Sequence, residues 1–454
     1  MAARKGTSRS GVTETEDQEH QQLFGRVAAV DVGKASGMVC TRLPKGRGYT
    51  ARCWEVTAVM SAVRVLAREL AGLGIEIITL ESTSDYWRIW YYVFEDAGLR
   101  VQLVSPDQAR QLRGRPKTDR LDAQWLARLT QWGLLRPSFV PPSPIRVLRQ
   151  LTRARTDLVR DRTRCWQRLE KLLEDALIKV SSVASKMTTE SAKDMVKGLI
   201  EGETDPVTLA GLARTRMKAK HDQLVQALDG MFQAHHSLLA AQLRAQIGFL
   251  DGQIGALEPQ IGAALAAIPA SWGTDEDGVT GPDAGHGPGA AVLAAADRLD
   301  EIPGVSRDLA MSIIAETGLD MTRFATAGHL VSWAGLCPVQ ADSATRRKTR
   351  KGRGNKYLRT YLGQAAIAAR TTDSFLGERY QRIARRRGPA RAQVAVARSI
   401  LVIIWHLLSD PAARYHDLGP GHYTARTSKD KKIRNHIRQL AALGVQATIT
   451  STAS

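Results

Sequence analysis

Apolar residues along the first third of the chain follow two different spacings, which predict alternating strands and helices. Short apolar runs bounded by turn residues predict strands. These runs cover residues 26–42, 49–56, 75–82 and 99–104. Apolar positions three or four residues apart predict helices over residues 57–73, 85–97 and 119–132. Strands come first and then alternate with helices, so we expect an α/β layer domain with a mixed sheet.

Helical spacing dominates the remainder of the chain. After a proline-rich break, residues 145–180 read as one long helix, and residues 204–266 as helices that pack back on it. Residues 272–289 are dense in Gly, Pro and Asp, which is typical of a flexible linker. We therefore expect six segments: a disordered leader (1–25), an α/β domain (26–140), a helical coiled-coil region (145–270), a flexible linker (271–294), a wholly helical C-terminal domain (295–410) and a basic tail (411–454).

The charge of the chain points to a polyanionic partner. Its 454 residues include 64 Lys and Arg against 45 Asp and Glu, which gives a net charge of +19. Nucleic acid is the most common partner of such a chain. A membrane surface is the competing partner, but the best apolar run, residues 394–408, is interrupted by Arg398 and His406 and falls short of the roughly 20 residues that span a bilayer. We expect a cytoplasmic protein that binds nucleic acid and no membrane.

Cysteines and histidines do not suggest a metal or disulfide site. No two cysteines form a Cys-x-x-Cys pair, which argues against a zinc site or a disulfide framework and fits a reducing cytoplasm. Adjacent His235 and His236 cannot share a helix face, so we interpret them as structural or surface residues. The four widely spaced cysteines are Cys40, Cys53, Cys165 and Cys337.

An arginine-rich stretch lies within the predicted long helix. Residues 146–168 contain eight arginines and only two acidic residues. One interpretation is a solvated helix whose other face packs or dimerises. The other is a basic helix that follows a phosphate backbone. The sequence leaves both interpretations open.

Four acidic residues form the first candidate site. Asp31 interrupts an apolar run and Glu81 ends another, and an unpaired charge in a buried strand is unfavourable. Asp119 and Asp122 are three residues apart and therefore share one face of the predicted helix. Carboxylates placed in this way can converge on one or two hard divalent cations, Mg²⁺ or Mn²⁺, which assist cleavage of a phosphodiester. Any one of these acids alone would be an ordinary surface residue.

Residues 299–318 have the pattern of a helix-hairpin-helix. A Pro-Gly-Val turn precedes a helix whose free amides can hold a DNA phosphate, and Gly304 and Val305 are the candidate contacts. The alternative is an ordinary pair of packed helices joined by a turn.

A basic loop follows Ser343. Seven basic residues and no acidic residue lie from Arg346 to Lys356, which is the composition of a phosphate-binding loop. Neighbouring cations would favour the alkoxide of Ser343 and the negative charge that develops on an attacked phosphate. A serine in a loop is also a common turn residue. The candidate nucleic-acid contacts are Arg346, Arg347, Lys348, Arg350, Lys351, Arg353, Lys356 and Arg359.

Taken in order, these motifs resemble those of the DEDD transposases of the IS-one-ten (IS110) insertion-sequence family. The resemblance rests on Lys-Thr-Asp-x-x-Asp-Ala at residues 117–123, and on Gly-Leu-x-Pro at 335–338 followed by Ser343 and by Arg-Gly-Asn-Lys-x-Leu-Arg at 353–359. It extends over residues 26–180 and 297–440. Members of that family have a RuvC-like N-terminal domain of RNase H fold, a coiled-coil segment and a C-terminal transposase domain.

The resemblance also implies a chemistry and a set of partners. It implies that Ser343 attacks a DNA phosphate and forms a phosphoserine intermediate. It further implies an active site shared between protomers, a tetramer built from dimers, and a non-coding bridge RNA that pairs with donor and target double-stranded DNA. The metal ligands implied by the resemblance are Asp31, Glu81, Asp119 and Asp122.

Three functions are compatible with these features. The first is a DNA transposase or recombinase that excises and inserts its element with both metal and serine. The second is a RuvC-like metal-dependent nuclease, such as a junction resolvase, which needs no serine. The third is a non-catalytic protein that binds RNA or DNA. The acidic quartet occurs together with Ser343 beside a basic loop, which favours the first.

Overall fold

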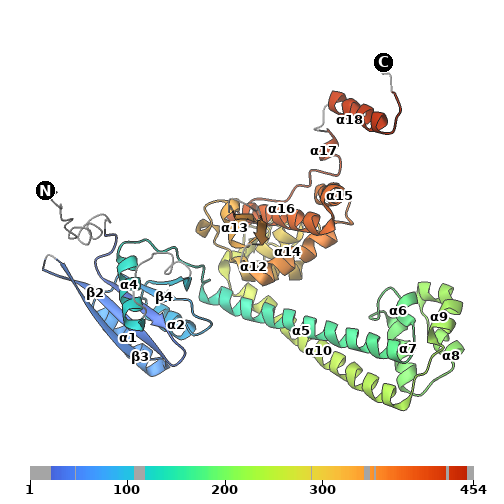
Figure 1. The fold of residues 1–454 in the computed structure, drawn as a ribbon, viewed down its shortest axis with the longest axis horizontal. Coiled ribbons are helices and arrows are strands. Elements are labelled where there is room, and N and C mark those ends of the chain that lie inside the picture. Colours follow the sequence, from blue (N-terminus) through green and yellow to red (C-terminus); the bar gives the residue numbers. More distant parts are fainter. Residues whose placement is uncertain are drawn as a thin grey trace, which may run out of the picture. The chain divides into compact units, whose positions relative to one another are not determined.

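The computed structural model describes residues 22–446, except residues 47, 107–117, 288, 342–347, 352–353 and 426–428. The chain divides into two compact units, Met1–Val140 and Pro141–Ser454. Each unit is described by itself, with the elements labelled as in Figure 1.

A five-stranded mixed sheet forms the centre of the first unit, as the sequence predicted. Its strand order is β3-β2-β1-β4-β5. Strands β1, β2 and β3 pair antiparallel, whereas β1, β4 and β5 pair parallel. The strands are β1 (Val27–Val32), β2 (Ser36–Lys45), β3 (Gly48–Thr57), β4 (Ile77–Glu81) and β5 (Val101–Val104).

One predicted strand proved to be two. Residues 26–42 were expected to form a single strand, but the chain turns at Gly33, whose amide donates to the carbonyl of Ser36 at 2.9 Å. β1 and β2 then pair antiparallel, with Val30 opposite Val39. Both strands are apolar, so hydrophobicity alone did not reveal the turn between them.

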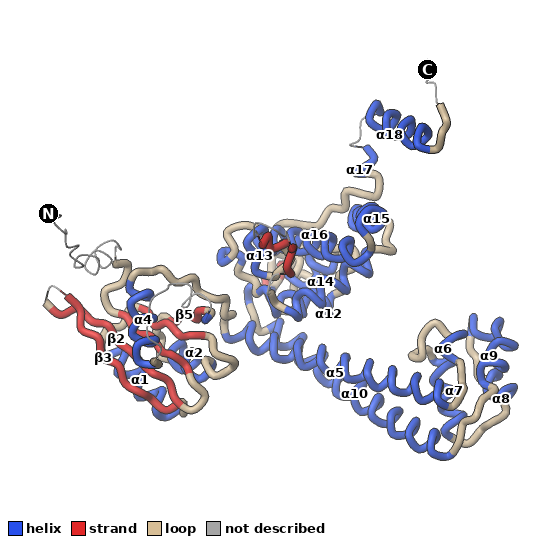
Figure 2. Tube along the Cα trace, viewed as in Figure 1, coloured by secondary structure: helices blue, strands red, loops and turns tan. Residues whose placement is uncertain are grey.

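Helices cover both faces of this sheet (Figure 2). On one face, α1 (Met60–Gly72) and α2 (Arg88–Asp96) pack with Val30 and Leu80. On the other face, α4 (Asp119–Gln131) packs with Val27 and Ala29 through Ala123, Leu126 and Ala127. Side chains alternate along a strand, so residues 27, 29 and 31 of β1 point to the α4 face.

The cysteine prediction was wrong for one pair. Cys40 of β2 and Cys53 of β3 lie directly opposite each other in the hairpin and are joined as a disulfide. Their separation of 13 residues matches no sequence motif. The register of the two strands is what brings the two cysteines together. Cys165 and Cys337 are free.

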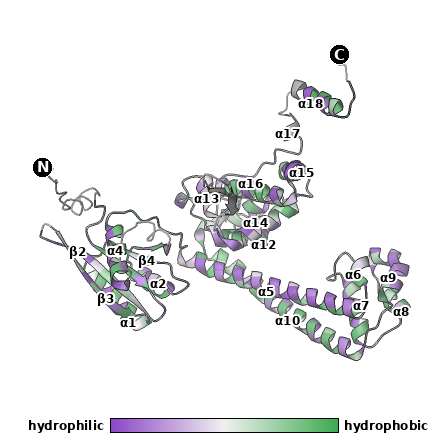
Figure 3. Ribbon diagram, in the orientation of Figure 1, coloured by the Kyte–Doolittle hydropathy of each residue, from purple (hydrophilic) through white to green (hydrophobic). Residues whose placement is uncertain are grey.

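Two long helices run side by side in the second unit. The chain leaves along α5 (Ser143–Asp175) and returns along α10 (Ala234–Ala266), and four short helices, α6 to α9, close the far end (Figure 1). The predicted helix over 145–180 ends five residues early, where Leu177 adopts a φ of 62°. Figure 3 shows hydrophobic and hydrophilic positions alternating around α5. The short helices are α6 (Val180–Val183), α7 (Glu190–Ile200), α8 (Pro206–Gly211) and α9 (His221–Leu228).

Helices also dominate the C-terminal half of this unit. The sequence did not predict the hairpin of β8 (Pro338–Ala341) and β9 (Lys348–Lys351) within it. The expected linker carries another short hairpin, β6 (Gly273–Thr274) and β7 (Thr280–Gly281). The helices are α11 (Ala295–Asp300), α12 (Arg307–Thr317), α13 (Ala327–Trp333), α14 (Lys356–Ala369), α15 (Phe375–Arg387), α16 (Pro389–Ser409), α17 (His422–Ala425) and α18 (Lys429–Ala442).

Helix α16 is the central helix of this half. Among the described residues it is the one helix long and apolar enough to cross a membrane. Its buried residues include Val396, Ile400, Leu401 and Ile404, and it packs against α13, α14 and α15. These contacts explain its apolar composition as that of a core helix.

The arginine-rich helix α5 is neutralised within the molecule. Six of the eight arginines between residues 146 and 168 form ion pairs with carboxylates. Arg155 pairs with Glu258 at 2.7 Å, and Arg162 with Asp251 at 2.6 Å. The structure therefore favours the packed-helix interpretation over a helix that follows a phosphate backbone. The six are Arg149, Arg153, Arg155, Arg160, Arg162 and Arg164.

Glu316 of α12 is fully buried at the junction of three helices. Its carboxylate accepts two hydrogen bonds from Arg153 of α5, at 2.7 and 2.8 Å, and lies 3.4 Å from Arg149. It also accepts from the side chain of Asn355, the residue that caps α14. Burial alone would lower the pKa of Arg153, but the hydrogen bond and charge of Glu316 raise that pKa above its ordinary value. One carboxylate thus ties α5 and α12 to the start of α14.

Replacing Glu316 by Ala should destabilise the second unit strongly. The variant leaves two guanidinium groups facing a site with no counter-charge, which typically costs about 3–5 kcal/mol. Thermal unfolding followed by circular dichroism measures the effect. Glu190→Ala, which removes an exposed i,i+3 pair with Lys193, is the matched control and should leave the transition unchanged. Identical transitions for the Glu316 variant and the wild type would contradict this account.

Candidate active site

Asp31 and Glu81 lie next to each other on adjacent parallel strands. In the register of β1 and β4, Val30 pairs with Leu80, so the following residues, Asp31 and Glu81, stand side by side. Neighbouring strands are about 4.8 Å apart, and both side chains point to the α4 face. Both residues are half-buried. Two carboxylates therefore meet at the carboxyl edge of the sheet.

Helix α4 carries the other two acidic residues to the same edge. Its last residue, Gln131, accepts the amides of Leu23 and Phe24 at 2.9 and 3.2 Å, just before β1 begins. α4 therefore runs antiparallel to β1, with its N-terminus toward the carboxyl ends of the strands. A hydrogen bond of 2.7 Å between the hydroxyls of Thr130 and Thr79 fixes the helix on β4.

Asp119 and Asp122 occupy the first turn of α4. Thr118 caps the helix, its hydroxyl accepting from the amide of Leu121 at 3.3 Å. The positive end of the helix dipole favours carboxylates at these positions. From Thr130 to Asp122 the helix rises about 12 Å, whereas Glu81 lies about 7 Å beyond Thr79, so the first turn reaches the end of β4. Asp122 is half-buried and Asp119 is exposed.

The donor set of this edge fits a hard divalent cation. Among the described residues it consists of four carboxylates and no thiolate or imidazole, which suits Mg²⁺ or Mn²⁺. The site lies at the carboxyl ends of parallel strands, where ligands of open α/β sheets commonly bind.

His235 and His236 lie closer together than their adjacent positions in the sequence suggested. Among the described residues, one group has ligand atoms that all lie within 4.8 Å of one another: Asp175, His235 and His236. Nδ1 of His236 accepts the amide of Gln233 at 3.1 Å, so the neutral ring carries its proton on Nε2, which faces Asp175 at 3.3 Å. Both ring nitrogens of His236 are thus already engaged in holding the start of α10. This arrangement favours a structural role over metal binding.

The predicted serine and much of its basic loop lie outside the described residues. This holds for Ser343, Arg346, Arg347 and Arg353. The loop connects β8 to β9, whose backbones pair from Pro338–Lys351 to Ala341–Lys348, and Arg350 lies opposite Val339. Both ends of the hairpin are close together, since a Cβ on Gly354 would meet the carbonyl oxygen of Ala334 at 2.3 Å.

The described basic residues after the hairpin open helix α14. Lys356 is exposed in its first turn, with Nζ 5.2 Å from the ring centre of Tyr357. The same ring lies under Arg153, at 4.6 Å, and its hydroxyl donates to Asp157 at 2.9 Å. Arg359 is half-buried one turn later. Of the predicted contacts whose side chains the structure describes, Lys356 is therefore the most accessible.

The Pro-Gly-Val turn is built differently from the phosphate-binding turn that the sequence suggested. The amide of Val305 donates to Ile302 at 2.9 Å, and Val305 itself is buried. Gly304 has a φ of 89°, and a Cβ there would meet the carbonyl oxygen of Ala365 at 2.3 Å. The glycine thus allows close packing against α14. These contacts favour the packed-helix alternative for this motif.

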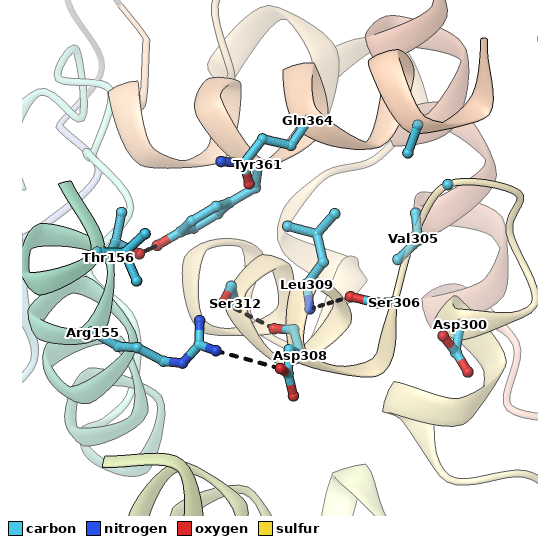
Figure 4. A pocket seen from close by; sticks show the side chains of 13 residues that line it. Arg155, Thr156, Asp300, Val305, Ser306, Asp308, Leu309, Ser312, Tyr361 and Gln364 are labelled. Carbon is cyan, nitrogen blue, oxygen red and sulfur yellow. Dashed lines mark hydrogen bonds and ion pairs between the residues drawn. The ribbon is translucent and has the colours of Figure 1, made fainter. Parts of the chain in front are cut away.

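A pocket of about 620 Å³ lies beside this turn, between α5, α12 and α14 (Figure 4). Arg155 lines it and is already paired with Asp308, at 3.5 Å. Asp300 also lines it, and burial raises the pKa of that carboxyl. Thr156 and Tyr361 close one side with a hydrogen bond of 2.7 Å. One paired arginine and two carboxylates make this a poor site for phosphate.

Comparison with known proteins gives two matching families. Residues 28–178 match a family described as "Transposase", of the DEDD IS110 type, and residues 296–381 match the "Transposase IS116/IS110/IS902 family". The chain is also similar to an insertion element IS116 uncharacterized 44.8 kDa protein of Streptomyces clavuligerus. The two are 26% identical over 308 residues, which cover 66% of this chain and 72% of the relative.

Proposed function

Because the chain belongs to the IS110 family of transposases, enzymes that act on DNA, we propose that it excises and inserts an insertion-sequence element by metal-assisted attack of Ser343 on DNA phosphates. The observation that carries this proposal is the meeting of Asp31, Glu81 and the first turn of α4 at one edge of the sheet. The N-terminal unit, with its mixed sheet, is compatible with an RNase H-like, RuvC-like domain.

The four carboxylates hold Mg²⁺ or Mn²⁺ in this proposal. A bound divalent cation would polarise the phosphate and stabilise the charge that develops on the attacking and leaving oxygens. The half-buried positions of Asp31, Glu81 and Asp122 limit access of water to the ligands. Asp119 and Asp122 lie in the first turn of α4, at the positive end of the helix dipole.

Ser343 provides the nucleophile. Its Oγ bonds to phosphorus as the bond from phosphorus to the leaving deoxyribose oxygen breaks, and the hydroxyl proton passes to solvent while the leaving oxygen gains one. A free DNA hydroxyl then displaces the serine, so one phosphodiester replaces another without hydrolysis. The cations from Arg346 to Lys356 would stabilise the charge of the attacked phosphate.

The proposal includes the partners implied by the family resemblance. These are double-stranded DNA, a non-coding bridge RNA that pairs with donor and target, and a tetramer built from dimers with a shared active site. The competing function is a RuvC-like nuclease that uses the carboxylates alone. It is supported by the same meeting of Asp31 and Glu81, because carboxylate-bound metal ions can activate water for cleavage without a serine.

Metal removal tests the proposal. DNA carrying the element ends and a target should recombine in the presence of the protein, the flanking non-coding RNA and Mg²⁺. Excess EDTA should stop the reaction, and Mg²⁺ or Mn²⁺ added back should restore it. Recombination that persists in metal-free buffer would contradict the carboxylate site, and nicked DNA without exchange would favour the nuclease.

A further inference from the structure

We propose that five exposed arginines of α15 and α16 form a binding surface for the phosphodiester backbone of nucleic acid. This surface, the α15–α16 arginine patch, consists of Arg385, Arg386, Arg387, Arg391 and Arg398. The choice of nucleic acid as the ligand of this surface rests on the proposed function. None of the five was among the nucleic-acid contacts expected from the sequence.

The charge of the patch is not compensated locally. From residue 379 to residue 409 the chain contains seven arginines and no Asp or Glu. Within the part of the chain that the structure describes, none of the five patch guanidinium groups lies within ion-pair distance of a carboxylate. The arginines of α5 differ, because six of them are paired. Among the described residues, these five arginines therefore offer more uncompensated positive charge than the arginines of α5.

The fold brings the five arginines close together. Helix α15 ends at Arg387, and α16 begins at Pro389, so a single residue, Gly388, connects them. Arg387 and Arg391 are four residues apart, which limits their Cα separation to about 14 Å. That distance corresponds to a few consecutive phosphates of one strand. Arg398 follows Arg391 two turns later on the exposed side of α16.

Helix stabilisation explains only part of this arrangement. Arg385, Arg386 and Arg387 lie in the last turn of α15, where a cation interacts favourably with the helix dipole. Arg391, in contrast, lies in the first turn of α16, where the dipole disfavours a cation. An exposed arginine at an unfavourable position is accounted for by an external anion. Guanidinium groups bind phosphate with two parallel hydrogen bonds, which suits a DNA or RNA backbone.

Salt dependence of binding tests the patch. We compare the full-length wild type with the triple variant Arg385→Gln, Arg386→Gln, Arg387→Gln in EDTA, so that no catalysis is required. Probes are a duplex DNA and a single-stranded RNA of equal length. Each lost phosphate contact should lower the slope of log K against log salt by about 0.9 on duplex DNA and about 0.7 on a single strand. A reduction of about two to three on the duplex, with affinity weakened at least tenfold, is the expected result.

Two further variants make the test decisive. The first is a control triple variant on α5, Arg160→Gln, Arg162→Gln, Arg164→Gln. It removes the same charge from ion-paired positions and should leave the slope of log K against log salt nearly unchanged. Arg391→Gln with Arg398→Gln repeats the test on α16 if the α15 triple variant unfolds. A reduced slope and affinity for only one of the two probes would support the patch and identify whether it binds DNA or RNA. Unchanged slopes for both probes, or equal losses in the α5 control, would overturn it. Metal-dependent recombination is measured separately, so failure of the patch does not bear on the carboxylate site.

Discussion

Replacing Asp31 by Asn should abolish metal-dependent strand cleavage while leaving the fold intact. The change removes one charged ligand from the sheet edge where Glu81 stands beside it. Loss of several kcal/mol of transition-state stabilisation corresponds to at least about a 10³-fold lower rate. Asn has nearly the same shape and volume as Asp, so the far-UV circular dichroism spectrum should match that of the wild type. Single-turnover cleavage of end-labelled DNA measures the rate.

Asp96→Asn is the matched control for this experiment. Asp96 is exposed at the end of α2, and the substitution is chemically identical. It should cleave at the wild-type rate. Cleavage by the Asp31 variant at a comparable rate would remove Asp31 from the active site, whereas absence of cleavage by the wild type would favour a non-catalytic nucleic-acid-binding protein.

Replacing Ser343 by Ala should abolish the covalent protein–DNA adduct and strand exchange. The variant keeps the carboxylates but lacks the oxygen that forms the bond to phosphorus, so exchange should fall by about 10³-fold or more. Denaturing electrophoresis of reactions with labelled DNA reveals the adduct directly. Ser332→Ala, at an exposed position of α13, is the matched control and should form adduct normally.

The two substitutions together separate the candidate functions. A recombinase loses exchange in both the Asp31 and the Ser343 variants. A RuvC-like nuclease loses cleavage only in the Asp31 variant, and its wild type releases nicked DNA without an adduct. Full exchange by the Ser343 variant would rule out serine as the nucleophile, and the carboxylate site would stand without it.

Hydrophobic pattern predicted the framework of the first unit well, and tertiary contacts explain where it failed. The strand predicted over residues 75–82 is β4, Ile77–Glu81, and the helix predicted over 119–132 is α4, Asp119–Gln131. The hairpin between β1 and β2 was missed because two apolar strands follow each other with only Gly33 to mark the turn. The Cys40–Cys53 pair was missed because it depends on strand register.

Charged residues show the limit of the sequence more clearly. Arg153 and Arg155 of α5 pair with Glu316 and Glu258, which come from helices more than 100 residues away in the chain. The segment that carries the α15–α16 arginine patch is similarly rich in arginine. Its five patch arginines have no such carboxylate partners among the described residues. Composition counts charge, whereas only the fold decides which charge is neutralised.

The sequence by itself determined that Asp31 and Glu81 fall in apolar strands and that Asp119 and Asp122 share a helix face, since these properties depend on local spacing. The tertiary structure decided that the four residues meet at one edge, because the parallel register of β1 and β4 and the antiparallel course of α4 join segments far apart in the chain. It also decided that Gly304 serves packing against α14. Pairing and packing energies depend on distance in space, and spacing along the chain does not fix that distance.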